Sequence, residues 1–145
     1  MKKEYIVHNE DEMTSLGSTF AKTLKPNTVI SLTGTLGAGK TVFVRGLAEA
    51  LGISEPIISP TFTLVQHYDG TLPLYHLDLY RLGEIDEFEL IDGRSILSSE
   101  SIICIEWPQL IESYLSDTNT VYVNIEIDED KARRVTIEMK EGFRR

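Results

Sequence analysis

The alternation of hydrophobic and polar positions divides the chain into short strands and helices. Residues 2–7 predict a first strand. Asn9, with Glu12 three residues later, then forms a candidate capping box at the start of a helix. The apolar face of this helix recurs at helical spacing, at Met13, Leu16, Phe20, Ala21 and Leu24.

An apolar, β-branched run at residues 28–32 predicts a buried strand, which leads into a glycine-rich segment. A second helix is predicted directly after that segment, because apolar residues again recur at helical spacing. The helix ends at Gly52, a residue suited to a helix C-terminus. Its apolar positions are Val42, Phe43, Val44, Leu47, Ala48 and Leu51.

The middle of the chain reads as a hairpin followed by shorter elements. Strands are predicted at residues 62–68 and 74–80, with Asp69-Gly70 near the turn between them. In the second strand, alternation places His76, Asp78 and Tyr80 on one face and Tyr75, Leu77 and Leu79 on the other.

The remaining elements complete the prediction of the fold. A short acidic helix is expected at residues 84–91, a buried strand at 101–105, and a helix that Pro108 opens. In a last hairpin each strand has one apolar face. The apolar residues are Val121, Val123, Ile125 and Ile127 on the first strand and Val135, Ile137 and Met139 on the second. Together these elements predict an α/β fold with a central mixed sheet flanked by helices, with antiparallel hairpins.

Residues 34–41, GTLGAGKT, match the phosphate-binding pattern G-x-x-x-x-G-K-[ST]. The strand before the loop and the helix after it supply the context that the pattern needs. In such loops backbone N–H groups cradle the phosphates, and the positive end of the helix dipole adds to the attraction. Lys40 is therefore expected to reach the β- and γ-phosphates, and the Thr41 hydroxyl to ligate Mg²⁺.

Composition limits the kind of nucleotide protein that this can be. The chain has 145 residues, 41% of them hydrophobic and 26% charged, which suits a single P-loop domain over residues 1–145 rather than a large motor or transporter. Neither a signal peptide nor a membrane span is visible, so a cytoplasmic protein is expected. Cys104 is the one cysteine, which excludes an intrachain disulfide, and it is expected to be a small core residue.

The net charge is −9, and Arg94 is the one basic residue between positions 84 and 130. Such a surface repels a nucleic-acid backbone, so tight binding of RNA or DNA by this chain alone is not expected. Most of the acidic residues between positions 84 and 130 are explained by a solvated surface that keeps the protein in solution. A basic partner protein is the more specific alternative.

Three residues outside the loop are candidates for completing a site. Glu106 ends the buried strand at 101–105, at the edge where ligands bind in open α/β sheets, and would serve Mg²⁺. Asp78 lies on a largely buried face, where a carboxylate needs a partner or a metal, and would serve Mg²⁺ or orient the attacking water. Thr61 follows Ser59-Pro60 and would sense the γ-phosphate or Mg²⁺, unless the segment is a plain turn. His76 is expected to be structural.

Four segments, GTLGAGKT, SPTFTLVQHY, LYHLDLYRL and IEWP, occur in this order in the chain. The order and spacing resemble the bacterial TsaE family of small ATPases, which takes part in the threonylcarbamoyladenosine modification of transfer RNA. The resemblance extends from about residue 9 to residue 133. It implies a P-loop fold and a weak intrinsic ATPase activity that becomes productive with two larger partners, TsaB and TsaD, so that the chain acts on RNA indirectly.

The resemblance also implies roles for individual residues. The Mg²⁺ ligands fall on Thr41 and Glu106, the switch threonine on Thr61, and Glu10 and Arg133 lie toward the adenine. The expected catalytic set is Lys40, Thr61, Asp78 and Glu106. The expected ATP-binding set is Glu10, Gly34, Thr35, Leu36, Gly37, Ala38, Gly39, Lys40, Thr41 and Arg133.

Other nucleotide-dependent functions fit the sequence less well than an ATPase, with one exception. A small-molecule or nucleotide kinase needs an arginine-bearing lid, and Arg81 and Arg94 are the only arginines between positions 45 and 133. A GTPase is disfavoured because the chain contains neither N-K-x-D nor D-x-x-G. A module that binds nucleotide without hydrolysing it retains every motif and remains open.

Overall fold

A seven-stranded mixed sheet with the order β1-β7-β6-β2-β5-β4-β3 forms the centre of the molecule. The structure is a computed structural model and describes residues 1–35 and 37–144. The four central strands, β6, β2, β5 and β4, are parallel, and the outer strands β3, β7 and β1 pair antiparallel. The strands are β1 (Lys2–Val7), β2 (Thr28–Gly34), β3 (Val65–Tyr68), β4 (Leu74–Asp78), β5 (Ile102–Glu106), β6 (Asn119–Ile127) and β7 (Arg133–Met139).

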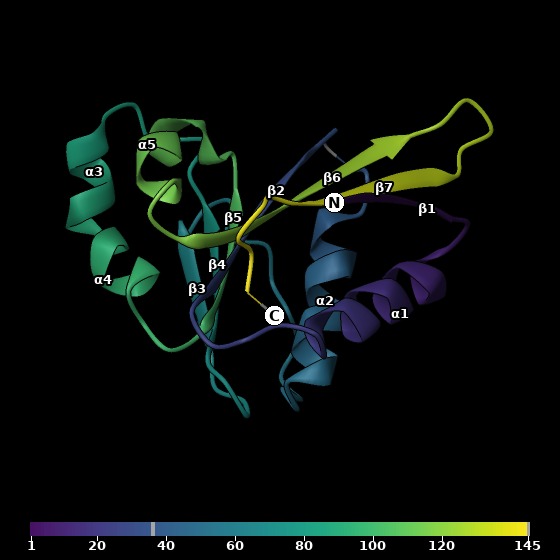
Figure 1. Cartoon of the computed structure of the whole chain (residues 1–145), viewed down its shortest axis with the longest axis horizontal. Coiled ribbons are helices and arrows are strands. Elements are labelled where there is room, and N and C mark those ends of the chain that lie inside the picture. The colour runs from purple at the N-terminus through teal and green to yellow at the C-terminus, as the bar shows by residue number, and fades with distance from the viewer. Residues whose placement is uncertain (36, 145) are drawn as a thin grey trace.

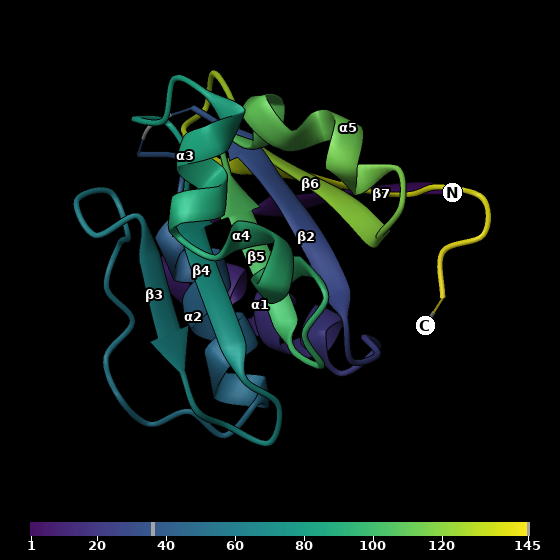
Figure 2. The same ribbon diagram turned by 90° about the vertical axis from the view of Figure 1, so that its left-hand side faces the viewer.

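Helices cover both faces of the sheet (Figures 1 and 2). The long helices α1 (Glu10–Ala21) and α2 (Lys40–Ala50) lie together on one face. The other face carries shorter helices, α3 (Ile85–Leu90), α4 (Gly93–Leu97), the 3₁₀ turn η1 (Pro108–Ile111) and α5 (Glu112–Leu115). This arrangement confirms the α/β prediction of a mixed sheet flanked by helices.

Alternate residues of the central strands divide the core between these two helical layers. In β2, Ile30 and Leu32 pack with α1 and α2, whereas Val29 packs with the short helices on the opposite face. All three side chains are fully buried. Strands buried on both faces are typical of parallel sheets covered by helices, and the burial of consecutive residues in β2 reflects this.

Two expectations about the first hairpin are wrong at its ends. Residues 61–64 form a turn, closed by a hydrogen bond from Leu64 N to Pro60 O of 2.7 Å, so β3 begins only at Val65. β4 ends at Asp78, whose Oδ1 accepts a hydrogen bond from the Tyr80 backbone N–H, and this turn leaves Tyr80 exposed. The predicted face is correct for His76 and Asp78, which are buried, but not for Tyr80.

Other boundaries differ in detail. The Asn9 side chain accepts a hydrogen bond from Glu12 N, as the capping box requires. The Glu12 carboxylate, however, accepts from His8 N rather than from Asn9 N. Pro108 opens a 3₁₀ turn that continues into only one turn of α-helix. None of the helices in the described part of the chain is both long and apolar enough to cross a membrane.

Candidate functional site

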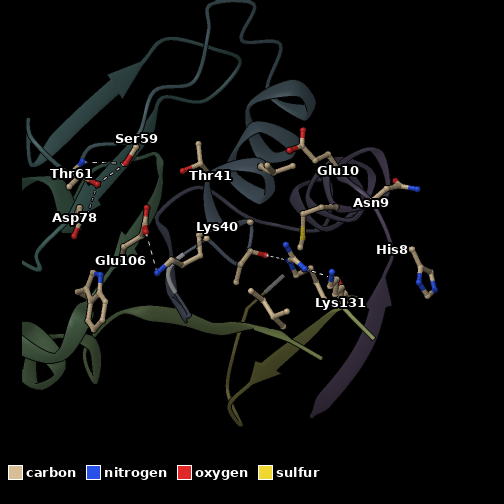
Figure 3. Close-up of a pocket in the computed structure, with 18 residues that line it drawn as sticks. His8, Asn9, Glu10, Lys40, Thr41, Ser59, Thr61, Asp78, Glu106 and Lys131 are labelled. Carbon is tan, nitrogen blue, oxygen red and sulfur yellow. Dashed lines mark hydrogen bonds and ion pairs between the residues drawn. The ribbon is translucent and has the colours of Figure 1, made fainter. Parts of the chain in front are cut away.

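A cleft of about 670 Å³ opens at the carboxyl ends of the parallel strands, beside the start of α2. Strands β2, β4 and β5 end at this edge of the sheet. Ligands in open α/β sheets usually bind at this edge. Residues from widely separated segments line the cleft (Figure 3). The lining residues are His8, Asn9, Glu10, Met13, Gly37, Ala38, Gly39, Lys40, Thr41, Val42, Ser59, Thr61, Asp78, Glu106, Trp107, Ile127, Lys131 and Arg133.

The glycines of the loop allow the chain to turn sharply from β2 into α2. Gly34 has φ 139°, and a Cβ there would lie 2.0 Å from the carbonyl oxygen of Ile125 on the neighbouring strand. Gly39 takes the left-handed conformation, φ 108°, directly before the first turn of α2. Any other residue at position 34 would force β2 and β6 apart. Leu36 lies outside the described residues.

Lys40 is the first residue of α2 and its ammonium group lies over the strand end. Its Nζ donates to Gly34 O at 3.1 Å and lies 3.6 Å from Oε1 of Glu106. Both side chains are buried, with relative exposures of 7% and 8%. A buried charge is costly unless it is paired, so the lysine and the glutamate stabilise each other here.

Glu106 has a second partner on its other carboxylate oxygen. Nε2 of His76 lies 2.6 Å from Oε2 of Glu106. His76 and Asp78 come from β4, which runs parallel to β5 with Asp78 opposite Glu106. Alternation within the strands places all three side chains on the face of the sheet that carries α2.

Asp78 connects the sheet to the segment at residues 59–61, which leads into the turn. Its Oδ2 accepts a hydrogen bond of 3.2 Å from the Thr61 hydroxyl, which lies 2.8 Å from the hydroxyl of Ser59. Figure 3 shows this polar chain at one end of the cleft, close to Glu106. The sequence had singled out Thr61 and Asp78 for separate reasons, and the structure brings them into direct contact.

Glu10, Asn9 and His8 lie at the opposite end, across Lys40 from Thr61 and Asp78 (Figure 3). Glu10 is exposed, and a salt bridge of 3.9 Å links it to Arg45.

Arg133 donates from Nε to Ala38 O at 3.1 Å and therefore contacts the loop backbone directly. Thr35 does not line the cleft, and its hydroxyl donates to Glu126 at 2.7 Å.

Trp107, Ile127 and Lys131 also line the cleft, although none of them is among the predicted site residues. Trp107 follows Glu106 in a left-handed conformation, φ 55°, and Lys40 Nζ lies 5.3 Å from the centroid of its ring. The position of Trp107 beside an expected metal ligand was the available signal. No sequence signal marks Ile127 or Lys131, which enter the cleft only because the β6–β7 hairpin folds against the loop.

Cys104 lies on the same face of β5 as Glu106 but is fully buried. Burial, and secondarily the negative charge of Glu106, raise the pKa of its thiol well above the ordinary value. The thiol is therefore protonated at neutral pH and is a core residue, as the sequence predicted.

The side chains suit a magnesium ion that is bound together with a phosphate. Mg²⁺ is usually held by one or two protein oxygens, with phosphate oxygens and water completing its shell. Thr41 and Glu106 offer a hydroxyl and a carboxylate on the cleft wall. Over residues 1–35 and 37–144 there is no group of three or more acidic, histidine or cysteine side chains that could hold a metal without such a ligand.

A family model described as threonylcarbamoyl adenosine biosynthesis protein TsaE matches residues 7–136. Curated proteins named tRNA threonylcarbamoyladenosine biosynthesis protein TsaE are similar over most of the chain. The protein from Treponema pallidum is 40% identical over 121 residues, covering 83% of this chain and 89% of its own length. The one from Aquifex aeolicus is 38% identical over 141 residues, covering 95% and 97%.

A solved structure agrees with these sequence matches. The crystal structure of Bacillus subtilis YdiB superposes with a TM-score of 0.79 and 32% sequence identity, and the match covers 99% of this chain and 89% of that one. The similarity therefore extends to the whole fold and is not limited to the glycine loop.

Proposed function

The chain belongs to the TsaE family of threonylcarbamoyl adenosine biosynthesis proteins, and on that basis we propose that it binds Mg-ATP in the cleft and hydrolyses it to support the modification of transfer RNA. The single observation that carries the proposal is the convergence of Lys40, Thr41 and Glu106 at the carboxyl ends of β2 and β5. This is the arrangement that a loop–helix phosphate site with an acidic metal ligand requires.

Phosphate binding is assigned to the loop at residues 34–41. Lys40 is held in position by Gly34 O and Glu106, and a bound phosphate chain would offer its ammonium group stronger, fully charged acceptors. The exchange would release Oε1 of Glu106 from its ion pair with Lys40. When bound, Mg²⁺ would neutralise charge on the β- and γ-phosphates, with Thr41 and Glu106 as its protein ligands.

Thr61 and Asp78 are assigned to the step after binding. Asp78 lies opposite Glu106 on the neighbouring strand, and Thr61 donates a hydrogen bond to Asp78. If Lys40 binds the β- and γ-phosphates, the γ-phosphate would lie near these side chains. The Thr61 hydroxyl is expected to contact the γ-phosphate side of the site, and Asp78 to orient the attacking water or a water of the metal shell. Glu10 and Arg133, at the other end of the cleft, are assigned to the adenine side.

We propose partner dependence from the family and from three exposed aromatic side chains, of which Trp107 lines the cleft, Tyr80 packs against Trp107, and Phe62 follows a lining residue in the chain. Phe62 is 85% exposed, Tyr80 is 67% exposed and Trp107 is 36% exposed. Phe62 directly follows Thr61, and Trp107 directly follows Glu106. A protein that covers these rings would reposition the adjoining catalytic residues, so we propose that the TsaB–TsaD pair acts there to raise the hydrolysis rate.

RNA is proposed to be an indirect target. The net charge of −9 opposes association with a phosphate backbone. The isolated chain is therefore expected to retain little transfer RNA in a filter-binding assay even at low salt, where phosphate contacts are strongest. Tight, salt-sensitive binding would show that the chain contacts RNA itself.

A kinase is the alternative function, since a P-loop also binds ATP for phosphoryl transfer. The two functions differ in where the γ-phosphate goes. To distinguish them, ATP labelled at the γ-phosphate is incubated with the protein, the TsaB–TsaD pair and a mixture of small-molecule acceptors. Chromatography then shows which product carries the label. Labelled free phosphate supports the ATPase, whereas a labelled organic product supports the kinase. ATP bound but never cleaved would indicate a binding module.

A further inference from the structure

His76 is the buried side chain that the site described so far leaves unexplained. It has a relative exposure of 0%, and its neighbours on the same sheet face include the apolar Leu74 and the fully buried Cys104. Its Nδ1 is buried and has no hydrogen-bond partner among the described residues. An apolar residue could fill this position without leaving such an atom, so core packing alone does not explain a histidine here.

The remaining ring nitrogen indicates what the histidine does. Nε2 lies 2.6 Å from Oε2 of Glu106, and an ionised carboxylate can only accept hydrogen bonds. Nε2 must therefore carry the proton and donate it.

The two oxygens of Glu106 are thereby made different. Oε2 is fixed by His76 from the side of β4, whereas Oε1 lies 3.6 Å from Lys40, a residue that lines the cleft. A carboxylate tied at one oxygen cannot rotate freely, so the other oxygen stays directed toward the phosphate loop. Hydrogen bonds of this kind from a neighbouring group orient metal ligands in many proteins.

We propose that His76 is a positioning residue that holds the Glu106 carboxylate through Nε2–H and presents Oε1 to the Mg-nucleotide. The proposal rests on the proposed function, because it assumes that Glu106 is used by a bound Mg-nucleotide. His76 itself contacts neither the nucleotide nor the attacking water.

The first test observes the hydrogen bond in the nucleotide-free protein. Long-range ¹H–¹⁵N correlation spectra report the tautomer of each histidine, and the chain has only His8, His67 and His76. His76→Gln identifies the His76 signal by its loss. We expect His76 to be held as the Nε2–H tautomer and its signal to shift in Glu106→Gln. An Nδ1–H tautomer, or a signal unaffected by Glu106→Gln, would overturn the proposal without any nucleotide experiment.

The second test measures how the interaction affects nucleotide binding. His76→Leu removes the donor, whereas His76→Gln supplies an amide N–H near the position of Nε2. By calorimetry, His76→Leu should weaken Mg-ATP binding by about tenfold while leaving ATP binding in EDTA nearly unchanged, and His76→Gln should recover most of the loss. His67→Leu is the matched control, because His67 lies on β3 outside the cleft and stacks on Tyr75.

The other possible results distinguish a failure of the positioning role of His76 from a failure of the proposed Mg-ATP function. Equal weakening with and without Mg²⁺, together with a lower midpoint of thermal unfolding, would mark His76 as merely structural. Wild-type binding in His76→Leu would overturn the positioning role alone. Absence of Mg-ATP binding by the wild-type protein would overturn the proposed function as well. If His76→Leu does not fold, the tautomer in the wild-type spectrum still decides.

Discussion

Asp78 and Glu106 lie directly opposite each other at the carboxyl ends of two adjacent parallel strands, β4 and β5. Their environments are nevertheless different. Asp78 accepts hydrogen bonds from Thr61 and from the Tyr80 backbone, whereas Glu106 is held by Lys40 and His76. Two acids that share one edge of the sheet therefore have different partners, and this difference fits the separate roles proposed for them, with Glu106 next to Lys40 and Asp78 next to Thr61.

Lys40→Ala is expected to weaken ATP binding strongly. The substitution removes the charge that would neutralise the β- and γ-phosphates, and a hydrogen bond to a charged group contributes about 1.5–3 kcal/mol, or roughly tenfold to a hundredfold in affinity. Calorimetric titration with Mg-ATP measures the loss. Lys22→Ala removes the same charge at the C-terminal cap of α1 and serves as the control. Equal affinities in the two variants would show that Lys40 does not bind the phosphates.

Thr61→Val and Asp78→Asn are expected to lower turnover far more than ATP affinity. Both groups are assigned to the transition state, so kcat should fall at least about tenfold while the ATP dissociation constant changes little. Thr63→Val, on the same turn, removes a hydroxyl that accepts a hydrogen bond from the Gln66 amide outside the cleft lining, and is the matched control. Parallel losses of affinity and turnover would identify Thr61 and Asp78 as supports of the pocket instead.

Trp107 should report nucleotide binding by its fluorescence. It is the only tryptophan in the chain, and its ring lies beside Lys40 and 4.9 Å from the ring of Tyr80. If phosphate draws Lys40 away from Glu106, the charge next to the indole changes and its emission should shift. Titration with Mg-ATP that leaves the emission constant, while calorimetry detects binding, would place the nucleotide away from this end of the cleft.

The close packing of α1 on α2 depends on glycine at two positions. A Cβ added to Gly46 would lie 2.2 Å from the carbonyl oxygen of Thr14 and 3.0 Å from Cα of Gly17. Gly46→Ala should therefore lower the free energy of unfolding by about 1–3 kcal/mol, the usual cost of overpacking. Thermal unfolding checks this against Gly83→Ala, whose added Cβ would meet only a flexible side chain at 3.7 Å. Equal midpoints would mean that the two helices can separate without cost.

Sequence predicted most of what is local in this fold, and least of what depends on distant pairing. The strand, loop and helix around residues 34–41 follow from spacing within one segment. The pairing of β1 with β7 at the sheet edge has no local signal, since the two strands lie at opposite ends of the chain. Helix α4 was missed because Asp92 starts it in a left-handed conformation and it has only five residues.

The same distinction applies to the site. Lys40, Thr41 and Glu106 carry motif signals, whereas the contact between Glu106 and His76 arises only when β4 pairs with β5. The sequence placed His76 on the correct face but gave no reason to connect it with Glu106. Arg133 was expected on the adenine side, and its hydrogen bond to Ala38 O depends on how the β6–β7 hairpin reaches back to the loop.

The most direct test of ATP hydrolysis in this cleft is phosphate release by the wild-type chain and by Glu106→Gln, each with the TsaB–TsaD pair and Mg-ATP. Glutamine keeps the size of the side chain but removes the charge that a metal ligand needs, so we expect the wild-type rate to rise with the pair and the variant to be at least about tenfold slower. Lys22→Ala should match the wild type. Equal rates for Glu106→Gln and the wild-type chain, or no phosphate release from a wild-type chain that binds Mg-ATP, would contradict the assignment.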